Sequence, residues 1–201
     1  HNLPRLLLRS DDVQFCGVGM CWREEWREEG GCYQINLTRP VWVDPAPDPW
    51  QTYRRMRSDS TAAWGAFMNL GQEQFVASNS PETFVTVDEG RVCTRPIKGT
   101  RPRSVDVVTD ARLREALAAS AKDRAELTMI VDLARNDLGR VCRPERIGAG
   151  PRVLHSHANV HHASQEVYGQ LRDGRDAWDL LAAAFPPGSV TGAPKVRACQ
   201  R

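Results

Sequence analysis

A predicted β-hairpin is the feature that most constrains the fold of this chain. Short alternating segments at 84–87 and 91–94 flank Asp88-Glu89-Gly90, and Gly90 can adopt the positive φ that a short hairpin loop needs. From Ala62 to the hairpin the patterns are those of strands, whereas helical patterns follow the hairpin. The chain is therefore predicted to combine strands and helices.

The second hairpin strand leads into the segment Arg95-Pro96-Ile97-Lys98-Gly99-Thr100-Arg101-Pro102-Arg103. Its prolines restrict the backbone on both sides, and Gly99 lets the chain approach a ligand without a side chain in the way. We predict that Lys98 is held in a turn as a candidate nucleophile, with the Thr100 hydroxyl beside it. The competing interpretation is a solvated hairpin end.

Composition narrows the functional classes. The 201 residues carry a formal net charge of +2 with acids and bases interleaved, so no binding to nucleic acid or to an anionic membrane is predicted. No apolar segment approaches the roughly 20 residues of a membrane helix. The six cysteines form no C-x-x-C pair, which argues against a zinc site or a disulfide framework and favours the reduced cytoplasm.

The remaining elements are assigned from hydrophobic periodicity and turn residues. Before the hairpin we expect strands at 6–8, 13–18, 32–38, 64–70 and 74–78, and helices at 22–29 and 51–57. The strand at 32–38 should place Tyr33, Ile35 and Leu37 on one face. After the hairpin we expect helices at 110–120 (capped by Asp110), 122–138 and 176–185, and strands at 141–147 and 153–171 around a Gly148-Ala149-Gly150 turn.

Glu126 is a candidate site residue on the predicted helix 122–138. It lies one turn before Ile130, at or beside the apolar face formed by Met129, Ile130 and Leu133. A carboxylate in that position needs a partner, a metal or a cleft. The alternative is that Glu126 pairs with a nearby arginine at the helix edge.

Two further clusters could bind ligands. His155, His157 and His161 should share one face of a strand while His162 points the other way, so one functional histidine is favoured over a zinc site. The glycine-rich segment 188–195 leads into a helix that is predicted to begin at Pro194. The segment lacks the Gly-Lys-Ser/Thr ending of a P-loop. Its free amides and the hydroxyls of Ser189 and Thr191 suit a carboxylate or a phosphate.

The order of these motifs resembles that of the chorismate-utilising enzymes, in particular component I of the aminodeoxychorismate and anthranilate synthases. The matching segments are Tyr33 to Thr38, Ser80-Pro81-Glu82, Pro96 to Arg103, Ala125-Glu126, Met129 to Arg140, Val160-His161-His162 and Phe185 to Arg197. The resemblance implies an α/β fold with a two-sheet β-sandwich core and helices packed outside. Residues 1–201 would be part of one catalytic domain, with 1–60 towards its N-terminal region and 61–201 in its core.

The resemblance also implies a reaction. Lysine at position 98 is similar to the aminodeoxychorismate synthase form, whereas anthranilate synthases usually carry alanine there. Lys98 would attack C2 of chorismate, Glu82 would protonate the departing C4 hydroxyl, and ammonia would then enter at C4. His162 would face the ring, Gly99, Thr100 and Ser189 would line the substrate site, and Glu126 would bind Mg²⁺. A glutamine amidotransferase subunit or domain would supply the ammonia.

General chemistry agrees with these roles. A lysine with an ordinary pKa of about 10.4 is mostly protonated at pH 7, so a nucleophilic lysine needs an environment that favours its free amine. A carboxyl that donates a proton near neutrality needs a raised pKa. Magnesium prefers oxygen ligands and commonly takes one or two protein carboxylates.

Other interpretations and departures from the pattern remain. Thr83 stands where the family usually has arginine, and Ala163-Ser164-Gln165 differs from the residues that usually follow the histidine. Anthranilate or isochorismate chemistry is the nearest enzymatic alternative, and a non-catalytic chorismate- or tryptophan-binding protein is the alternative from another class. The chain also resembles a fragment that lacks both termini of the family domain, so we expect residues 1–201 alone to be inactive and poorly stable.

Overall fold

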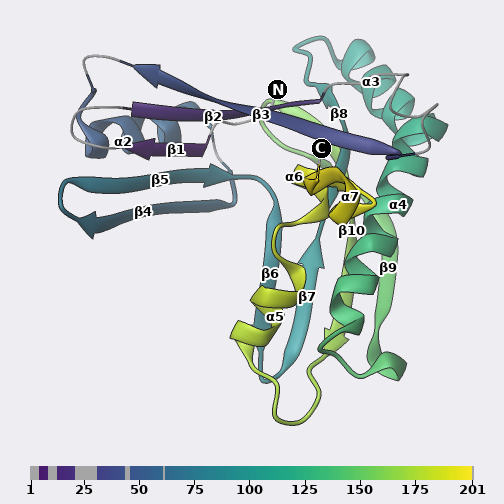
Figure 1. Cartoon of the computed structure of the whole chain (residues 1–201). Helices are drawn as coiled ribbons and strands as arrows, with labels where there is room; N and C mark the ends of the chain where they lie inside the picture. The colour runs from purple at the N-terminus through teal and green to yellow at the C-terminus, as the bar shows by residue number, and fades with distance from the viewer. Residues whose placement is uncertain (1–4, 9–12, 21–30, 44–45, 61, 201) are drawn as a thin grey trace. The chain divides into compact units, whose positions relative to one another are not determined.

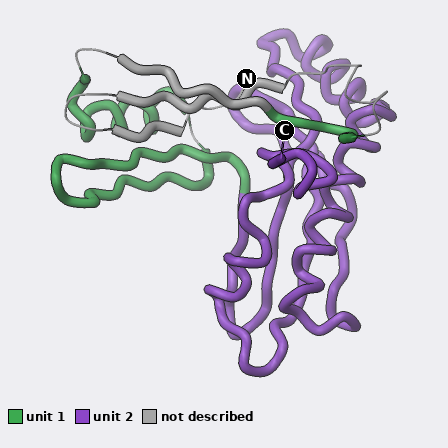
Figure 2. Tube along the Cα trace, viewed as in Figure 1, with its two compact units in different colours: residues 1–82 green, residues 83–201 purple. Residues whose placement is uncertain are grey.

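The computed structural model describes residues 5–8, 13–20, 31–43, 46–60 and 62–200. The chain forms two compact units, residues 1–82 and 83–201 (Figure 2). Each unit combines a sheet with helices (Figure 1), so the predicted α/β class is confirmed. The helix predicted at 22–29 lies outside the described residues. Among the helices that are described, none has the length and apolar character needed to cross a membrane.

The first unit is built on antiparallel strands in the order β3-β2-β1-β5-β4. Their bounds are Arg5–Leu8 (β1), Val13–Met20 (β2), Gln34–Val43 (β3), Trp64–Gly71 (β4) and Gln74–Ser80 (β5). Helix α2 (Pro49–Asp59) begins where the Asp48 carboxylate accepts a hydrogen bond from the Gln51 amide. Ala77 of β5 is fully buried beneath Tyr53, Met56, Phe67 and Phe75. These elements confirm the predicted strands and short helix of this region.

Strand β3 differs from its predicted alternation. Tyr33 lies before the strand begins and is 67% exposed, whereas Gln34 is 6% exposed. The prediction that Tyr33 shares the inner face with Ile35 is therefore wrong, although Ile35 is buried as expected. The period-two rule fixes a side chain only inside the paired strand, and Tyr33 precedes it.

The second unit contains a five-stranded antiparallel sheet centred on β10. Its strands are Thr83–Asp88 (β6), Arg91–Arg95 (β7), Ile97–Pro102 (β8), Gly148–Ser156 (β9) and Val160–Gln170 (β10). Strand β10 pairs with β9 along one edge and with β7 and then β8 along the other. The predicted hairpin is confirmed as β6–β7, with positive φ at Glu89 and Gly90.

Three helices pack with this sheet to form the main core. They are α3 (Val107–Ala119), α4 (Ala121–Gly139) and α5 (Ala177–Ala184), and α4 runs alongside β9 and β10 in Figure 1. The buried core side chains are Val92, Leu117, Leu127, Val131, Leu138, Val141, Cys142, Ala163, Val167, Leu171, Leu180 and Ala184. Asp176 forms a capping box with Asp179 at the start of α5, which agrees with the helix predicted there.

Three local predictions in this unit are wrong. The residue that caps α3 is Asp106, and Asp110 lies in the first turn instead. Residues 141–147 contain one isolated bridge at Cys142 and the 3₁₀ helix η1 (Pro144–Arg146) rather than a strand. The glycines at 148–150 extend β9, and the hairpin turn comes later, between β9 and β10. The chain then ends in α6 (Gly188–Thr191), β11 (Gly192–Ala193) and α7 (Lys195–Cys199).

Candidate active site

A β-bulge positions Lys98. The prediction that Lys98 lies in a turn is wrong, because β8 continues the line of β7 along β10 after the interruption at Pro96. Between the paired positions Ile97↔Ser164 and Thr100↔His162, β8 has one more residue than β10. Gly99 takes φ +84° at this point. An extra residue re-aims the side chains beside it, so the bulge sets the direction of Lys98.

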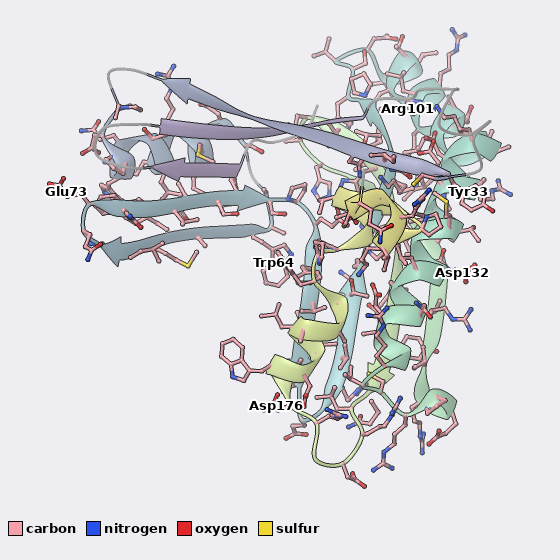
Figure 3. All side chains as sticks on the ribbon, in the orientation of Figure 1. Tyr33, Trp64, Glu73, Arg101, Asp132 and Asp176 are labelled. Carbon is pink, nitrogen blue, oxygen red and sulfur yellow. The ribbon has the colours of Figure 1, made fainter. Side chains whose placement is uncertain are left out.

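Gly99 also allows close packing under the bulge. A Cβ built on Gly99 would lie 2.8 Å from Leu117 Cδ1 of α3 and 2.9 Å from Asp123 Cβ of α4. Arg101, labelled in Figure 3, lies on the same strand, and its guanidinium is 2.8 Å from the Asp123 carboxylate. The strand that carries Lys98 is therefore fixed to both helices.

The Lys98 side chain is buried and hydrogen-bonded. It is 9% exposed, and its Nζ donates to the backbone carbonyl of Ser189 at 3.3 Å. Ser189 lies in α6, 91 residues further along the chain. The structure thus brings together two of the predicted site residues through the backbone carbonyl of Ser189.

The short helix that carries Ser189 is packed onto α4. A Cβ on Gly188 would lie 2.3 Å from Leu133 Cδ2, so a side chain at this position would have to displace the leucine. Thr191 Oγ1 closes the turn by donating to the Pro187 carbonyl at 3.0 Å. Helix α7 has only five residues, so the predicted anion site at its N-terminus gains no support from the structure.

The histidines are arranged differently from the prediction. The hairpin between β9 and β10 reverses the chain, so His162 lies opposite His155 in the register and on the same face. His157 Nε2 and His162 Nε2 are 3.3 Å apart, and the ring centroids of His155 and His162 are 5.4 Å apart. His161 points to the opposite face, which it shares with Ala163 of the core. The sequence did not predict this arrangement, because the turn was expected at 148–150 and none was expected between Ser156 and Val160.

His162 is held in its neutral form. It is 7% exposed, and burial, followed by the neighbouring rings of His157 and His155, lowers its pKa from 6.5 to about 4. Its cross-strand neighbour on β8 is Thr100, another predicted site residue. A neutral imidazole at pH 7 can accept or donate one hydrogen bond at each ring nitrogen, depending on the tautomer.

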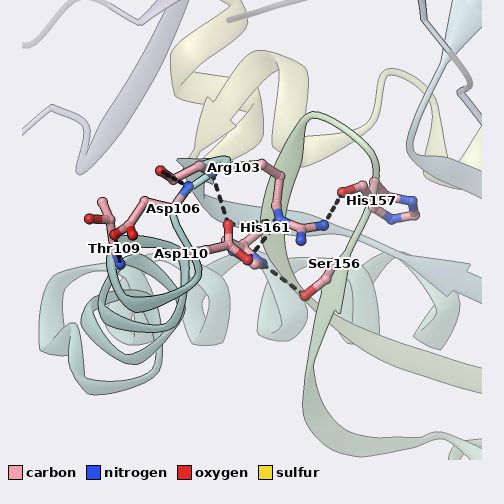
Figure 4. Close-up of polar contacts among 8 residues, drawn as sticks. Arg103, Asp106, Thr109, Asp110, Ser156, His157 and His161 are labelled. Atoms are coloured by element: carbon pink, nitrogen blue, oxygen red, sulfur yellow. Dashed lines mark hydrogen bonds and ion pairs between the residues drawn. The ribbon is translucent and has the colours of Figure 1, made fainter.

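A polar network fixes the other side of β10 (Figure 4). The buried His161 ring contacts Asp110 Oδ1 through Nε2 at 3.0 Å and Ser156 Oγ through Nδ1 at 2.8 Å. Arg103 donates to Asp110 at 2.9 Å and to the His157 carbonyl at 2.6 Å. The Arg103 guanidinium is the main reason that the pKa of Asp110 lies well below its ordinary value. The network ties α3 to the β9–β10 hairpin, and thereby holds the turn that carries His157.

Glu126 fits one part of a cation site. It lies one turn after Asp123 on α4, its side chain is 11% exposed, and its Oε1 is buried with no hydrogen-bond partner. Lys122 Nζ lies 3.8 Å from this oxygen. A buried carboxylate oxygen of this kind suits Mg²⁺, which takes oxygen ligands. Within the described ranges, no three His, Cys, Asp or Glu side chains gather closely enough to hold a metal by themselves.

Glu82 belongs to the first unit. It is the last residue of that unit, directly before β6, and its side chain is partly exposed. The Ser80 hydroxyl accepts a hydrogen bond from the Glu82 amide at 3.3 Å and donates to its carbonyl at 3.2 Å. The backbone of the Ser80-Pro81-Glu82 segment is therefore held by the serine.

A buried ion pair at this site was not predicted from the sequence. Lys195 Nζ lies 2.5 Å from Asp137 Oδ2 and 2.9 Å from the Ala184 carbonyl. Burial raises the pKa of the Asp137 carboxyl, and the Lys195 ammonium opposes this effect. The position of Asp137 one turn after Leu133 on the inner stripe of α4 was the available signal.

The fold and these residues agree with one class of protein. The chain matches the family model described as chorismate binding enzyme over residues 23–201, and it belongs to that family. It is 43% identical over 178 residues to aminodeoxychorismate synthase component 1 of Escherichia coli (strain K12), covering 88% of this chain and 39% of that protein. It is 42% identical over 188 residues to the protein of the same name in Salmonella typhimurium, covering 92% of this chain and 41% of that protein.

Other relatives carry a different name. The chain is 42% identical over 176 residues to anthranilate synthase component 1 of Streptomyces coelicolor, covering 85% of this chain and 34% of the relative. Among solved structures, anthranilate synthase component I from Streptococcus pneumoniae TIGR4 matches with a TM-score of 0.66 and 26% identity, covering 96% of this chain and 36% of that one. The chain thus spans about two fifths or less of the length of these relatives.

Proposed function

We propose that the protein to which this chain belongs aminates chorismate at C4 with ammonia, giving 4-amino-4-deoxychorismate for p-aminobenzoate and folate synthesis. The observation that carries the proposal is Lys98, a buried lysine directed by a β-bulge and hydrogen-bonded to Ser189. Overall identity does not choose between amination at C4 and anthranilate formation, because relatives with both names are similarly close. The lysine at position 98 favours amination at C4.

In the proposed reaction, Lys98 acts as a nucleophile. Its neutral amine forms a bond to C2 of chorismate while both ring double bonds shift and the C4 hydroxyl leaves as water with a proton from Glu82. Ammonia then forms a bond to C4, both double bonds shift back, and the C2–Nζ bond breaks to release Lys98. The hydrogen bond to the Ser189 carbonyl would orient the amine before attack.

The surrounding residues would bind and orient the substrate. Neutral His162 would face the ring, and Gly99, Thr100 and Ser189 would line the substrate site. Glu126 would supply one carboxylate to Mg²⁺, whose charge would offset that of a substrate carboxylate when bound. The relatives are named component 1, which supports a partner component, and we propose a glutamine amidotransferase that makes the ammonia. We place the enzyme in the cytoplasm.

The test is a product assay on the full-length protein with chorismate, Mg²⁺ and an ammonium salt, with products identified by mass. We expect aminodeoxychorismate from the unaltered protein. Lys98→Ala should lower its formation by at least about 100-fold while chorismate binding persists. Arg143→Ala is the control, because Arg143 forms an exposed ion pair with Asp173.

Other products would contradict the proposal in defined ways. Anthranilate would show that Lys98 does not decide the reaction. Binding of chorismate without any product would favour a non-catalytic chorismate-binding protein. Unchanged activity of Lys98→Ala would remove the covalent mechanism.

A further inference from the structure

We propose that Lys195 and Asp137 are positioning residues, which hold Ser189 against Lys98 by closing the segment that carries Ser189. The inference rests on the proposed function of Lys98. It assigns a role in the reaction to two residues that lie outside the proposed set of catalytic, substrate-binding and metal-binding residues.

Lys195 joins both ends of the segment to α4. Its ammonium donates to the Ala184 carbonyl, at the end of α5, and to Asp137 Oδ2 on α4. Residues 184 and 195 bracket α6 and β11, so one side chain closes the base of this loop. Ser189 lies within it, and its carbonyl accepts the hydrogen bond of Lys98.

The contact is enclosed. The side chains of Lys195 and Asp137 are 12% and 6% exposed, and Asp137 Oδ1 is buried without a hydrogen-bond partner. A buried ion pair costs desolvation energy, so apolar residues of similar size often stabilise a fold equally well. The buried ion pair is therefore better explained by a role in fixing the geometry of this loop than by a gain in stability. Gly188 packed on Leu133 supports the same segment from α4 without charge.

Removal of one charge should release the segment. In Asp137→Asn the buried ammonium of Lys195 loses its counter-charge and is expected to turn towards solvent. The base of the loop then opens, and the Ser189 carbonyl no longer has a fixed place beside Lys98. A misplacement of about 1 Å at a reacting group lowers turnover by about 10- to 100-fold.

The experiment combines amine labelling with turnover in the full-length protein. Limited acetylation with acetic anhydride, mapped by mass spectrometry, gives the rate at Lys98 relative to Lys122, whose side chain is 69% exposed. We expect this ratio to rise by about tenfold in Asp137→Asn and in Lys195→Met, because the enclosure of Lys98 opens. Lys195→Arg keeps the charge and should remain close to the unaltered protein in both labelling and turnover.

The matched control is Asp173→Asn, which makes the same chemical change in an ion pair whose carboxylate is 94% exposed. It should change neither readout. If Lys98 labelling and aminodeoxychorismate turnover in Asp137→Asn and Lys195→Met equal those of Asp173→Asn, the positioning role is wrong. If Asp137→Asn fails to fold by circular dichroism, loss of turnover in folded Lys195→Met with rescue in Lys195→Arg still supports the role, and absence of that loss overturns it. Failure of the unaltered protein to make aminodeoxychorismate would contradict the proposed function, whereas the labelling ratio would still test the geometry.

Discussion

At the scale of single residues, one glycine decides where the candidate nucleophile points. Gly99 combines a positive φ with close contacts to two helices, and both conditions exclude a side chain. From the sequence, Gly99 is predicted to let the chain approach a ligand. In the structure the groups that lie close to Gly99 are Leu117 and Asp123 of the same chain.

Gly99→Ala should lower the free energy of unfolding by about 2–4 kcal/mol, from backbone strain and from overpacking against α3 and α4. Gly174→Ala is the matched control, because Gly174 has a similar φ of +75° with no atom within 4 Å of an added Cβ. It should cost only about 1–2 kcal/mol, the strain alone. Urea unfolding of the two variants measures the difference, and equal losses would contradict the packing argument.

At the scale of elements, α3 and the β9–β10 hairpin are joined through His161. This ring is 1% exposed and bridges Asp110 of α3 to Ser156 of β9. The predicted strand 153–171 contained both Ser156 and His161 but no turn between them. Only the hairpin brings these residues together, five positions apart in sequence.

His161→Ala should destabilise the protein by about 2–4 kcal/mol, because it leaves a cavity and removes a hydrogen bond to a carboxylate. Ser156→Ala removes one hydrogen bond at an exposed position and should cost about 1 kcal/mol or less. Denaturant midpoints of both variants test this order. A loss in Ser156→Ala that equals the loss in His161→Ala would show that Asp110 contributes nothing.

At the scale of the whole molecule, stability should depend on pH through the buried histidine. The pKa of His162 is about 4 in the folded protein and about 6.5 when exposed, so the unfolded state binds the proton first as pH falls. The stability that the neutral His162 contributes is therefore fully present above pH 6.5 and is lost as the pH falls from 6.5 to 4. This single group can account for about 2–3 kcal/mol between pH 7.5 and 4.5.

His162→Gln should remove that part of the pH dependence. Urea unfolding at pH 7.5 and 4.5 gives the loss for each protein, and the loss should be smaller in the variant. Asp110 acts at lower pH, since its depressed pKa keeps it ionised in the folded state until well below pH 4. Identical losses in the two proteins would show that His162 is not buried in its neutral form.

Local patterns were sufficient for much of the fold. The β6–β7 hairpin, helix α4 and the capped helix α5 were predicted from turn residues, periodicity and an aspartate, all within a few positions of one another. Lys98 was singled out for the same reason, because prolines and a glycine surround it. Errors fell at Asp110 and at 141–150, where several residues compete for the same cap or turn.

What only the tertiary structure decided is which distant residues meet. The sequence determined that a lysine, a glutamate and a histidine of the right chemistry are present, and it could indicate the elements that carry them. It could not show that Lys98 lies in a bulged strand facing the Ser189 carbonyl, or that Asp137 pairs with Lys195 across 58 positions. Such contacts depend on strand register and helix packing, which no short segment of the chain encodes by itself.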